Sequence, residues 1–133
     1  MDYFSTLETL LDASSAPYSG FNVASIVISI SGEHFKGVNV ESVAYPTTMC
    51  AERNAIFSAI TNGVQRGEIA EVHILARNAE KQFVAAFPCG ACRQVIAEQS
   101  DNQAKVYVYG SKDKVSEHRI SDLLPEAFFT LDA

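Results

Sequence analysis

The sequence predicts an α/β domain in which helices pack against a mixed β-sheet. Two observations lead to this fold class. Residues 21–30, FNVASIVISI, form a dense run of β-branched and other apolar residues, which is typical of a strand covered on both faces. Helical and strand patterns then alternate in the order helix, hairpin, helix, strand, helix, strand. Because the 133 residues contain no repeat, low-complexity tract or linker, we expect residues 1–133 to form one domain.

The first half of the chain is predicted to form a helix and a hairpin. Residues 3–13 place four apolar side chains at helical spacing, and residues 16–20, APYSG, end that helix. The strand at 21–30 is followed by a turn signal at 31–33, Ser-Gly-Glu. Residues 34–41 are then expected to form the return strand of a hairpin.

The second half continues the alternation, with apolar stripes at helical spacing and short apolar runs at strand length. The expected elements are a helix at 50–63, strands at 71–76 and, more weakly, 82–86, a helix at 92–99, a strand at 105–110 and a closing apolar segment at 123–129.

The charge balance favours a small-molecule substrate. The formal net charge is −6, and the ten Lys and Arg residues form no long basic run, so we expect no nucleic-acid partner. No stretch approaches the ~20 apolar residues of a membrane span. The N-terminus has no basic region followed by a long apolar run. We therefore expect a cytoplasmic protein without a membrane association.

Three cysteines carry the chemistry. Cys89 and Cys92 form a Cys-x-x-Cys pair, and Cys50 stands alone in TMCAER. An odd count without a secretion signal argues against a disulfide framework and favours metal binding or thiol chemistry. Cys50 and Cys89 lie where helices begin, and Cys92 lies in the first turn of the second helix. Free backbone N–H groups and the positive dipole end favour thiolates there, so two facing helix starts could gather one Zn²⁺.

Glu52 suggests that such a zinc site is catalytic. Three protein ligands leave a fourth position for water, and no histidine stands at ligand spacing from a cysteine. Zinc lowers the pKa of water, and a carboxylate beside it can carry the proton. Three thiolates and Zn²⁺ sum to a charge of −1, which weakens the metal as a Lewis acid. Arg53 and Arg93 are the candidates to hydrogen-bond the sulfurs and offset that charge.

These residues match a known signature, in which a Cys or His is followed by x-Glu and, downstream, by Pro-Cys-x-x-Cys. The chain resembles the small, all-cysteine, homotetrameric branch of the cytidine deaminases, from Ala16 to Phe128. The resemblance implies a three-layer α/β/α domain with a mixed, roughly five-stranded sheet. The segments that carry it, in the order and spacing of the family, are APYSGF, NVESVAY, CAERNA, PCGACRQ and LLPEAF.

The implied activity is hydrolytic deamination of cytidine and deoxycytidine to uridine and deoxyuridine, within pyrimidine salvage. One Zn²⁺ per chain would be bound by Cys50, Cys89 and Cys92. A zinc-bound hydroxide would attack C4 of the base, and Glu52 would move the protons to N3 and to the leaving ammonia. The backbones of Ala51 and Cys89 would hold the edge of the base.

The resemblance also implies a nucleoside site at a subunit interface. Asn39 and Glu41, two apart on a strand, share one face and suit sugar hydroxyls, whereas Val38 and Val40 are expected to point into the core. Phe21 would pack against the nucleoside. Phe128 matches the C-terminal phenylalanine that, in the family, reaches the base bound by a neighbouring subunit. Phe129 could exchange roles with Phe128. The expected assembly is a homotetramer, with Tyr45 near the subunit contacts.

Other interpretations of the same residues stay open. Small departures from the family pattern, such as Ser42 after Glu41, leave room for a cytosine nucleoside such as blasticidin S as the substrate. The non-enzyme alternative is a structural zinc module used for protein contacts, and a third alternative is a redox Cys-x-x-Cys pair. Asn39 and Glu41 could be ordinary strand residues, and Phe21 a core residue. Arg53 and Arg93 could be solvated charges, and the three histidines surface or packing residues.

Overall fold

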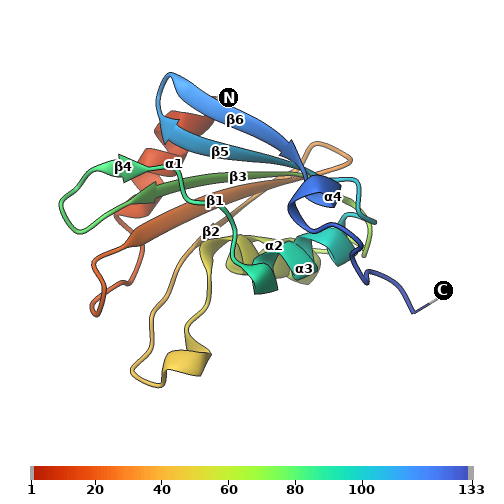
Figure 1. The fold of residues 1–133 in the computed structure, drawn as a ribbon, viewed down its shortest axis with the longest axis horizontal. Coiled ribbons are helices and arrows are strands. Elements are labelled where there is room, and N and C mark those ends of the chain that lie inside the picture. The colour runs from red at the N-terminus through yellow and green to blue at the C-terminus, as the bar shows by residue number, and fades with distance from the viewer. Residues whose placement is uncertain (1, 132–133) are drawn as a thin grey trace.

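The computed structural model describes residues 2–131, which fold into one mixed sheet with helices on both faces (Figure 1). The elements are α1 (Tyr3–Leu11), β1 (Asn22–Ser29), β2 (His34–Val38), the 3-10 helix η1 (Tyr45–Thr47), α2 (Ala51–Thr61), β3 (Ile69–Arg77), β4 (Phe83–Val84), α3 (Gly90–Gln99), β5 (Lys105–Ser111), β6 (Lys114–Arg119) and α4 (Ile120–Leu123).

The sheet has the order β2-β1-β3-β5-β6, with β4 added beside β3. The β3–β5 pair is parallel and the other pairs are antiparallel, so the predicted mixed sheet is confirmed. Within residues 2–131 the sheet has six strands rather than roughly five. The strand that was not predicted is β6, KVSEHR. Because β6 lies at the edge of the sheet, its residues are exposed and mostly polar and show no apolar strand pattern.

The predicted three layers are present. On one face, α1 buries Leu7 and Leu11 against β1, β3 and β5. On the other face, α2 and α3 contribute Ile56 and Ile96 to a larger cluster on the opposite side of the same strands. β1 has buried residues from Ala24 to Ser29, as a strand covered on both faces requires. This arrangement puts the starts of α2 and α3 on one face of the sheet.

Some predicted boundaries differ from the structure. The hairpin's return strand ends at Val38 rather than at 41, so Asn39 and Glu41 follow β2 instead of lying within it. Val38 packs partly against the α1-side cluster, but Val40 is 44% exposed, so its predicted place in the core was wrong. Val40 pairs only through isolated bridges with Ser15 and Met49. The chain leaves the sheet here because these loop pairings replace the hairpin pairing.

After Val40 the chain forms a projecting segment, residues 42–48, which contains η1 (Figure 1). The helices within residues 2–131 are all too short or too polar to cross a membrane.

Candidate active site

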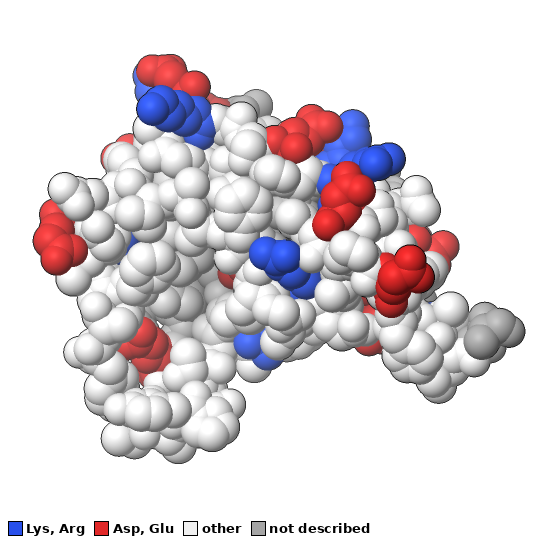
Figure 2. Space-filling model, viewed as in Figure 1, with Lys and Arg blue, Asp and Glu red and all other residues white. Residues whose placement is uncertain are grey.

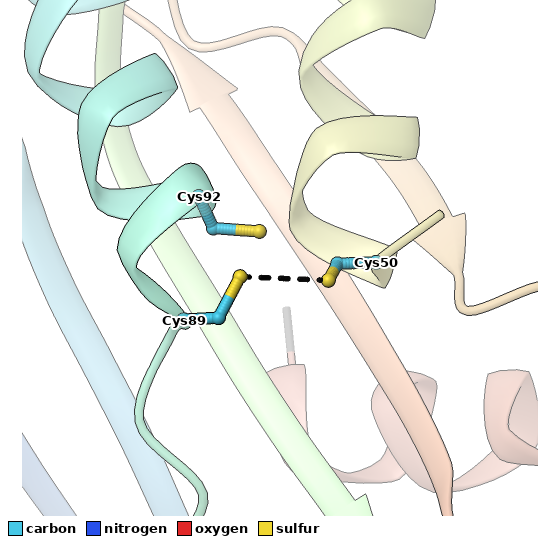
Figure 3. Close-up of side chains that lie close together, drawn as sticks. All are labelled: Cys50, Cys89 and Cys92. Carbon is cyan, nitrogen blue, oxygen red and sulfur yellow. Dashed lines mark hydrogen bonds between the residues drawn. The ribbon is translucent and has the colours of Figure 1, made fainter. Parts of the chain in front are cut away.

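The three sulfurs converge between the starts of α2 and α3 (Figure 3). Cys50 is the N-cap residue of α2, Cys89 is the N-cap of α3, and Cys92 follows in the first turn of α3. Neither N-cap side chain makes a capping hydrogen bond to the backbone of its helix, so the first-turn N–H groups add positive potential near the thiols. The sulfurs all lie within 4.8 Å of one another, as the sequence predicts for a shared metal.

The geometry of this cluster fits Zn²⁺. Tetrahedral zinc with Zn–S bonds of about 2.3 Å requires sulfurs about 3.8 Å apart. The Sγ atoms of Cys50 and Cys89 are 3.7 Å apart. Within residues 2–131 no histidine or carboxylate joins the three thiols as a fourth close ligand. A set of three protein ligands is typical of catalytic zinc sites, which keep one position open.

Arg53 supplies the positive charge that the cluster needs. Its Nη2 donates to Cys50 Sγ at 3.4 Å, so the predicted contact exists. The Cys92 thiol and then Arg53 donate to Cys50, and together they hold the pKa of Cys50 well below its usual range. The same contact with the Cys50 thiolate, followed by burial, raises the pKa of the Cys92 thiol. The site therefore favours a thiolate at Cys50 even before a metal adds its charge.

Arg93 makes other contacts than the sequence led us to expect. Its Nε donates to the carbonyl of Pro88 at 2.8 Å and its Nη1 to the carbonyl of Leu123 at 2.7 Å. Among the described residues, its hydrogen bonds thus go to backbone carbonyls and not to sulfur. Because Pro88 precedes Cys89 and Leu123 ends α4, Arg93 ties the cysteine-bearing turn to α4.

Glu52 lies in the first turn of α2, next to the thiols in sequence and in space. Its side chain is 5% exposed, and burial raises the pKa of its carboxyl to about 7. A carboxyl with a pKa near neutrality can both take up and release a proton at physiological pH. The nearby Cys50 thiolate raises this pKa further, and Arg53 opposes the shift.

A pocket of about 230 Å³ opens beside these groups. It brings together the metal-site residues Cys50 and Cys89 with Ala51 and Glu52. Three of the residues predicted to contact the nucleoside, Phe21, Asn39 and Glu41, line the same pocket. Sequence reasoning missed six of the lining residues, which lie on segments without a polar motif. The full lining is Phe21, Val23, Asn39, Glu41, Thr48, Met49, Cys50, Ala51, Glu52, Ile74, Ala86, Phe87 and Cys89. Of those missed, Met49 and Phe87 had a signal, since they directly precede Cys50 and the Pro-Cys-Gly-Ala-Cys motif.

Asn39 is held tightly by the protein itself. Its Oδ1 accepts hydrogen bonds from the Val23 N–H at 2.9 Å and from the Ser14 hydroxyl. Its Nδ2 donates to the Phe21 carbonyl at 2.8 Å. The side chain is 8% exposed at the pocket wall. Both acceptor positions are therefore used, and one N–H of the amide stays available.

Glu41 is held by the segment that follows α1. Its Oε1 accepts from the Tyr18 and Ser19 N–H groups at 3.0 and 3.1 Å, and its Oε2 accepts from the Ser19 hydroxyl. The Ser19 hydroxyl is the main cause that lowers the pKa of Glu41, which keeps this carboxylate charged. One of its four lone-pair positions, on Oε2, is left free.

Phe128 lies apart from this pocket. It is 67% exposed and lines a separate hollow with Arg66 and Leu131 near the end of the chain. Its carbonyl is held by Gln94, and Phe129 beside it packs against the core cluster of α2 and α3. Of the two phenylalanines, Phe128 therefore has the more exposed ring.

Known proteins support the same interpretation. Residues 2–109 match the family model described as the cytidine and deoxycytidylate deaminase zinc-binding region. The chain is 38% identical to a cytidine deaminase of Halalkalibacterium halodurans over 116 residues, 87% of this chain and 83% of that protein. It is 39% identical to a cytidine deaminase of Sporosarcina psychrophila over 112 residues, 84% of this chain and 78% of that protein.

A solved structure has the same fold. The crystal structure of cytidine deaminase from Burkholderia pseudomallei superposes with a TM-score of 0.84 at 34% identity, covering 94% of this chain and 95% of that one. The family match covers most of the chain, including the three cysteines and Glu52. With its zinc-compatible thiols and buried carboxyl group, this chain belongs to the cytidine and deoxycytidylate deaminase family.

Proposed function

We propose that the protein hydrolyses cytidine and 2′-deoxycytidine to uridine and 2′-deoxyuridine, with release of ammonia. One observation carries this proposal: the buried Glu52 and the thiols of Cys50 and Cys89 line one pocket with Asn39 and Glu41. A base can thus meet acid–base and metal chemistry while its sugar meets polar side chains. The relatives at 38–39% identity are named cytidine deaminases.

The chain's own residues account for the proton transfers. Bound Zn²⁺ would lower the pKa of a water molecule and make it a nucleophile at neutral pH. Glu52, whose pKa is raised to about 7 by burial, can accept the proton of the attacking water. It can then pass that proton to N3 of the ring. After taking a second proton, from the new hydroxyl group at C4, it can protonate the departing amine. Ala51 and Cys89 line the same pocket, which supports the proposed role of their backbones in holding the edge of the base.

The polar groups left free in the pocket match a single sugar hydroxyl. Asn39 retains one N–H donor and Glu41 one acceptor position, after their contacts within the protein are subtracted. A hydroxyl donates once and accepts, so it satisfies both. Phe21 adds an apolar wall. A site that reads one hydroxyl supports activity on both ribose and deoxyribose nucleosides.

We also propose that the active protein is a homotetramer with its active sites at subunit interfaces. The projecting segment 42–48 contains no charged residue, and Val43 and Tyr45 on it are 78% and 76% exposed. Figure 2 shows this uncharged segment beside a hollow in the surface. Exposed apolar side chains at a projecting tip favour a protein contact. The exposed Phe128 supplies a ring that a neighbouring pocket could receive. Light scattering of the purified protein tests the subunit count.

The remaining parts of the proposal are a single deaminase domain and a cytoplasmic location. The location is supported by the three free thiols, which form the metal site only while they are reduced. The alternative substrate is a related cytosine nucleoside such as blasticidin S. The non-enzyme alternative is a structural zinc module. It agrees less well with the buried Glu52 in the pocket and with a set of three zinc ligands, which leaves one coordination position open.

The test is the ultraviolet absorbance change of cytidine, and in parallel of blasticidin S, with purified zinc-loaded protein. We expect turnover of cytidine, and a loss of kcat of about 10²- to 10⁴-fold in Glu52→Gln, since one general acid–base group is removed. Glu33→Gln, on the exposed hairpin turn, is the matched control and should remain active. Turnover of blasticidin S but not of cytidine would identify the alternative nucleoside as the substrate. Zinc binding without any turnover would favour the structural module.

A further inference from the structure

The segment between α1 and β1 is fastened to the chain that follows β2. The Ser15 N–H donates to the Asn39 carbonyl at 3.1 Å, and the Glu41 N–H donates to the Ser15 carbonyl at 2.8 Å. These bonds form a short parallel bridge between Ser15 and Val40. The bridge sets the register between residues 14–23 and residues 39–41, so that Ser19 lies opposite Glu41.

The Ser19 side chain makes two contacts in this register. Its hydroxyl donates to Glu41 Oε2 and accepts a hydrogen bond from the Phe21 N–H at 3.0 Å. Gly20, between Ser19 and Phe21, has a φ of +68°, a conformation that suits glycine and folds the chain back toward the hydroxyl. One hydroxyl thus connects the backbone of the aromatic wall to the carboxylate at the other wall.

We infer that Ser19 is a positioning residue for the nucleoside, whose hydroxyl holds the Glu41 carboxylate and the Phe21 backbone in the arrangement that receives the sugar. This inference rests on the proposed function, because Glu41 and Phe21 are taken as the sugar-side walls of the pocket. Two of the three hydrogen bonds to Glu41 come from backbone N–H groups, which any residue other than proline at positions 18 and 19 would supply. The third donor depends on the identity of residue 19.

A carboxylate that is already held in place reduces the conformational entropy lost when the substrate binds. A free glutamate side chain samples many rotamers, and fixing it on binding weakens affinity. Glu41 is only partly buried, so without Ser19 its Oε2 would also exchange with water. The thiols and Glu52 make no contact with Ser19 among the hydrogen bonds of residues 2–131. Loss of the hydroxyl should therefore act on substrate binding rather than on the chemical step.

The experiment compares steady-state kinetics of Ser19→Ala, Ser19→Thr and Ser15→Ala on cytidine and deoxycytidine. Ser19→Ala should raise KM about 10-fold with kcat changed less than about 2-fold, as expected for the loss of one hydrogen bond to a charged group. Ser19→Thr keeps the hydroxyl and should restore KM. Ser15→Ala is the matched control, because the Ser15 side chain is exposed and only its backbone pairs with residues 39–41.

A double-mutant cycle with Glu41→Gln tests the route through Glu41. If Ser19 acts through the carboxylate, Ser19→Ala should add little to the KM of Glu41→Gln. An unchanged KM in Ser19→Ala, an equal fall in kcat, or the same KM effect in both backgrounds would overturn the inference.

A readout independent of turnover separates this inference from the proposed function. In a carbon-13 NMR titration, Ser19→Ala should raise the pKa of the Glu41 carboxyl, and Ser15→Ala should not. If the wild type turns over neither nucleoside, the proposed function fails. A raised Glu41 pKa would then still establish the hydrogen bond from Ser19 to Glu41. The role of Ser19 in positioning a nucleoside would, however, be refuted together with the function.

Discussion

Gly37 of β2 lies directly against the backbone of Ala55 in α2. A Cβ atom at position 37 would stand 2.4 Å from the backbone nitrogen of Ala55 and 2.4 Å from the carbonyl oxygen of Ala51. Only a residue without a side chain allows this approach. The contact sets how closely the first turn of α2, with Cys50 and Glu52, lies on the sheet.

Substitution of Gly37 should therefore disturb both stability and the metal site. We expect Gly37→Ala to lower the free energy of unfolding by about 1–3 kcal/mol, the usual effect of overpacking. Urea denaturation measures this, and chelator competition should show weaker zinc retention. Gly110→Ala is the matched control, because a Cβ there meets other atoms at 3.7 Å or more, which is ordinary contact. Equal stability losses in the two variants would contradict the close-approach argument.

Arg53 should strengthen zinc binding through its hydrogen bond to Cys50. We expect Arg53→Ala to weaken zinc affinity about 10- to 100-fold, as for other residues that hydrogen-bond a metal ligand. The measurement is zinc loss to a chromogenic chelator, with circular dichroism to show that the fold is kept. Arg119→Ala, at an exposed surface ion pair with Asp122, should lose zinc at the wild-type rate. Unchanged zinc retention in Arg53→Ala would exclude this role.

His73 is a buried histidine, and its burial favours the neutral ring. Its ring stacks against those of Tyr3 and Tyr107, at centroid distances of 4.3 and 4.5 Å. Its Nδ1 lies 2.8 Å from the Tyr109 hydroxyl, and its Nε2 lies 2.8 Å from a Glu71 oxygen. Burial lowers the pKa of His73 below its ordinary 6.5, although Glu71 acts in the opposite direction. The neutral ring donates from Nε2 to Glu71 and accepts from Tyr109 at Nδ1.

A pH dependence of stability follows from this depressed pKa. The unfolded chain binds a proton at His73 more readily than the folded chain does, so the stability contribution is complete above pH 6.5. It is lost as the pH falls from 6.5 toward the folded pKa. In urea unfolding between pH 5.5 and 7.5, His73 should add a stability contribution that rises with pH, while Glu52, with its pKa raised to about 7, contributes in the opposite direction. In His73→Gln, which keeps one donor and one acceptor but cannot titrate, the slope should become smaller. Identical slopes would show that other groups cause the dependence.

Phe128 and Phe129 should respond differently to truncation. Phe129 is partly buried against the core, so Phe129→Ala should lower the free energy of unfolding by about 1–2 kcal/mol, part of the value of a fully buried phenylalanine. Phe128→Ala should leave the stability of the isolated chain nearly unchanged, since its ring is 67% exposed. If Phe128 reaches a neighbouring pocket, this variant should raise KM for cytidine. Thermal unfolding and steady-state kinetics separate the two effects. A reversed pattern would show that Phe129, rather than Phe128, reaches the neighbouring pocket.

Much of the site could be predicted from the sequence by itself. The spacing of Cys50, Glu52, Cys89 and Cys92 indicated a zinc site with a proton-carrying acid, because helix starts and first turns are local features. The same is true of the buried strand at 21–30, whose composition alone demands two covered faces. The family was recognised from the order and spacing of the short motifs around these residues, and the three layers were expected from that resemblance.

Only the tertiary structure decided which partners the polar residues meet. Arg93 donates hydrogen bonds to the carbonyls of Pro88 and Leu123. Asn39 accepts hydrogen bonds from the Ser14 hydroxyl and from the backbone of β1. The contact from Ser19 to Glu41 joins positions 22 residues apart. Edge strand β6 was missed because its exposed residues carry no apolar pattern. The physical reason is common to these cases: hydrogen-bond partners distant in sequence depend on how loops pack, which hydrophobic periodicity does not record.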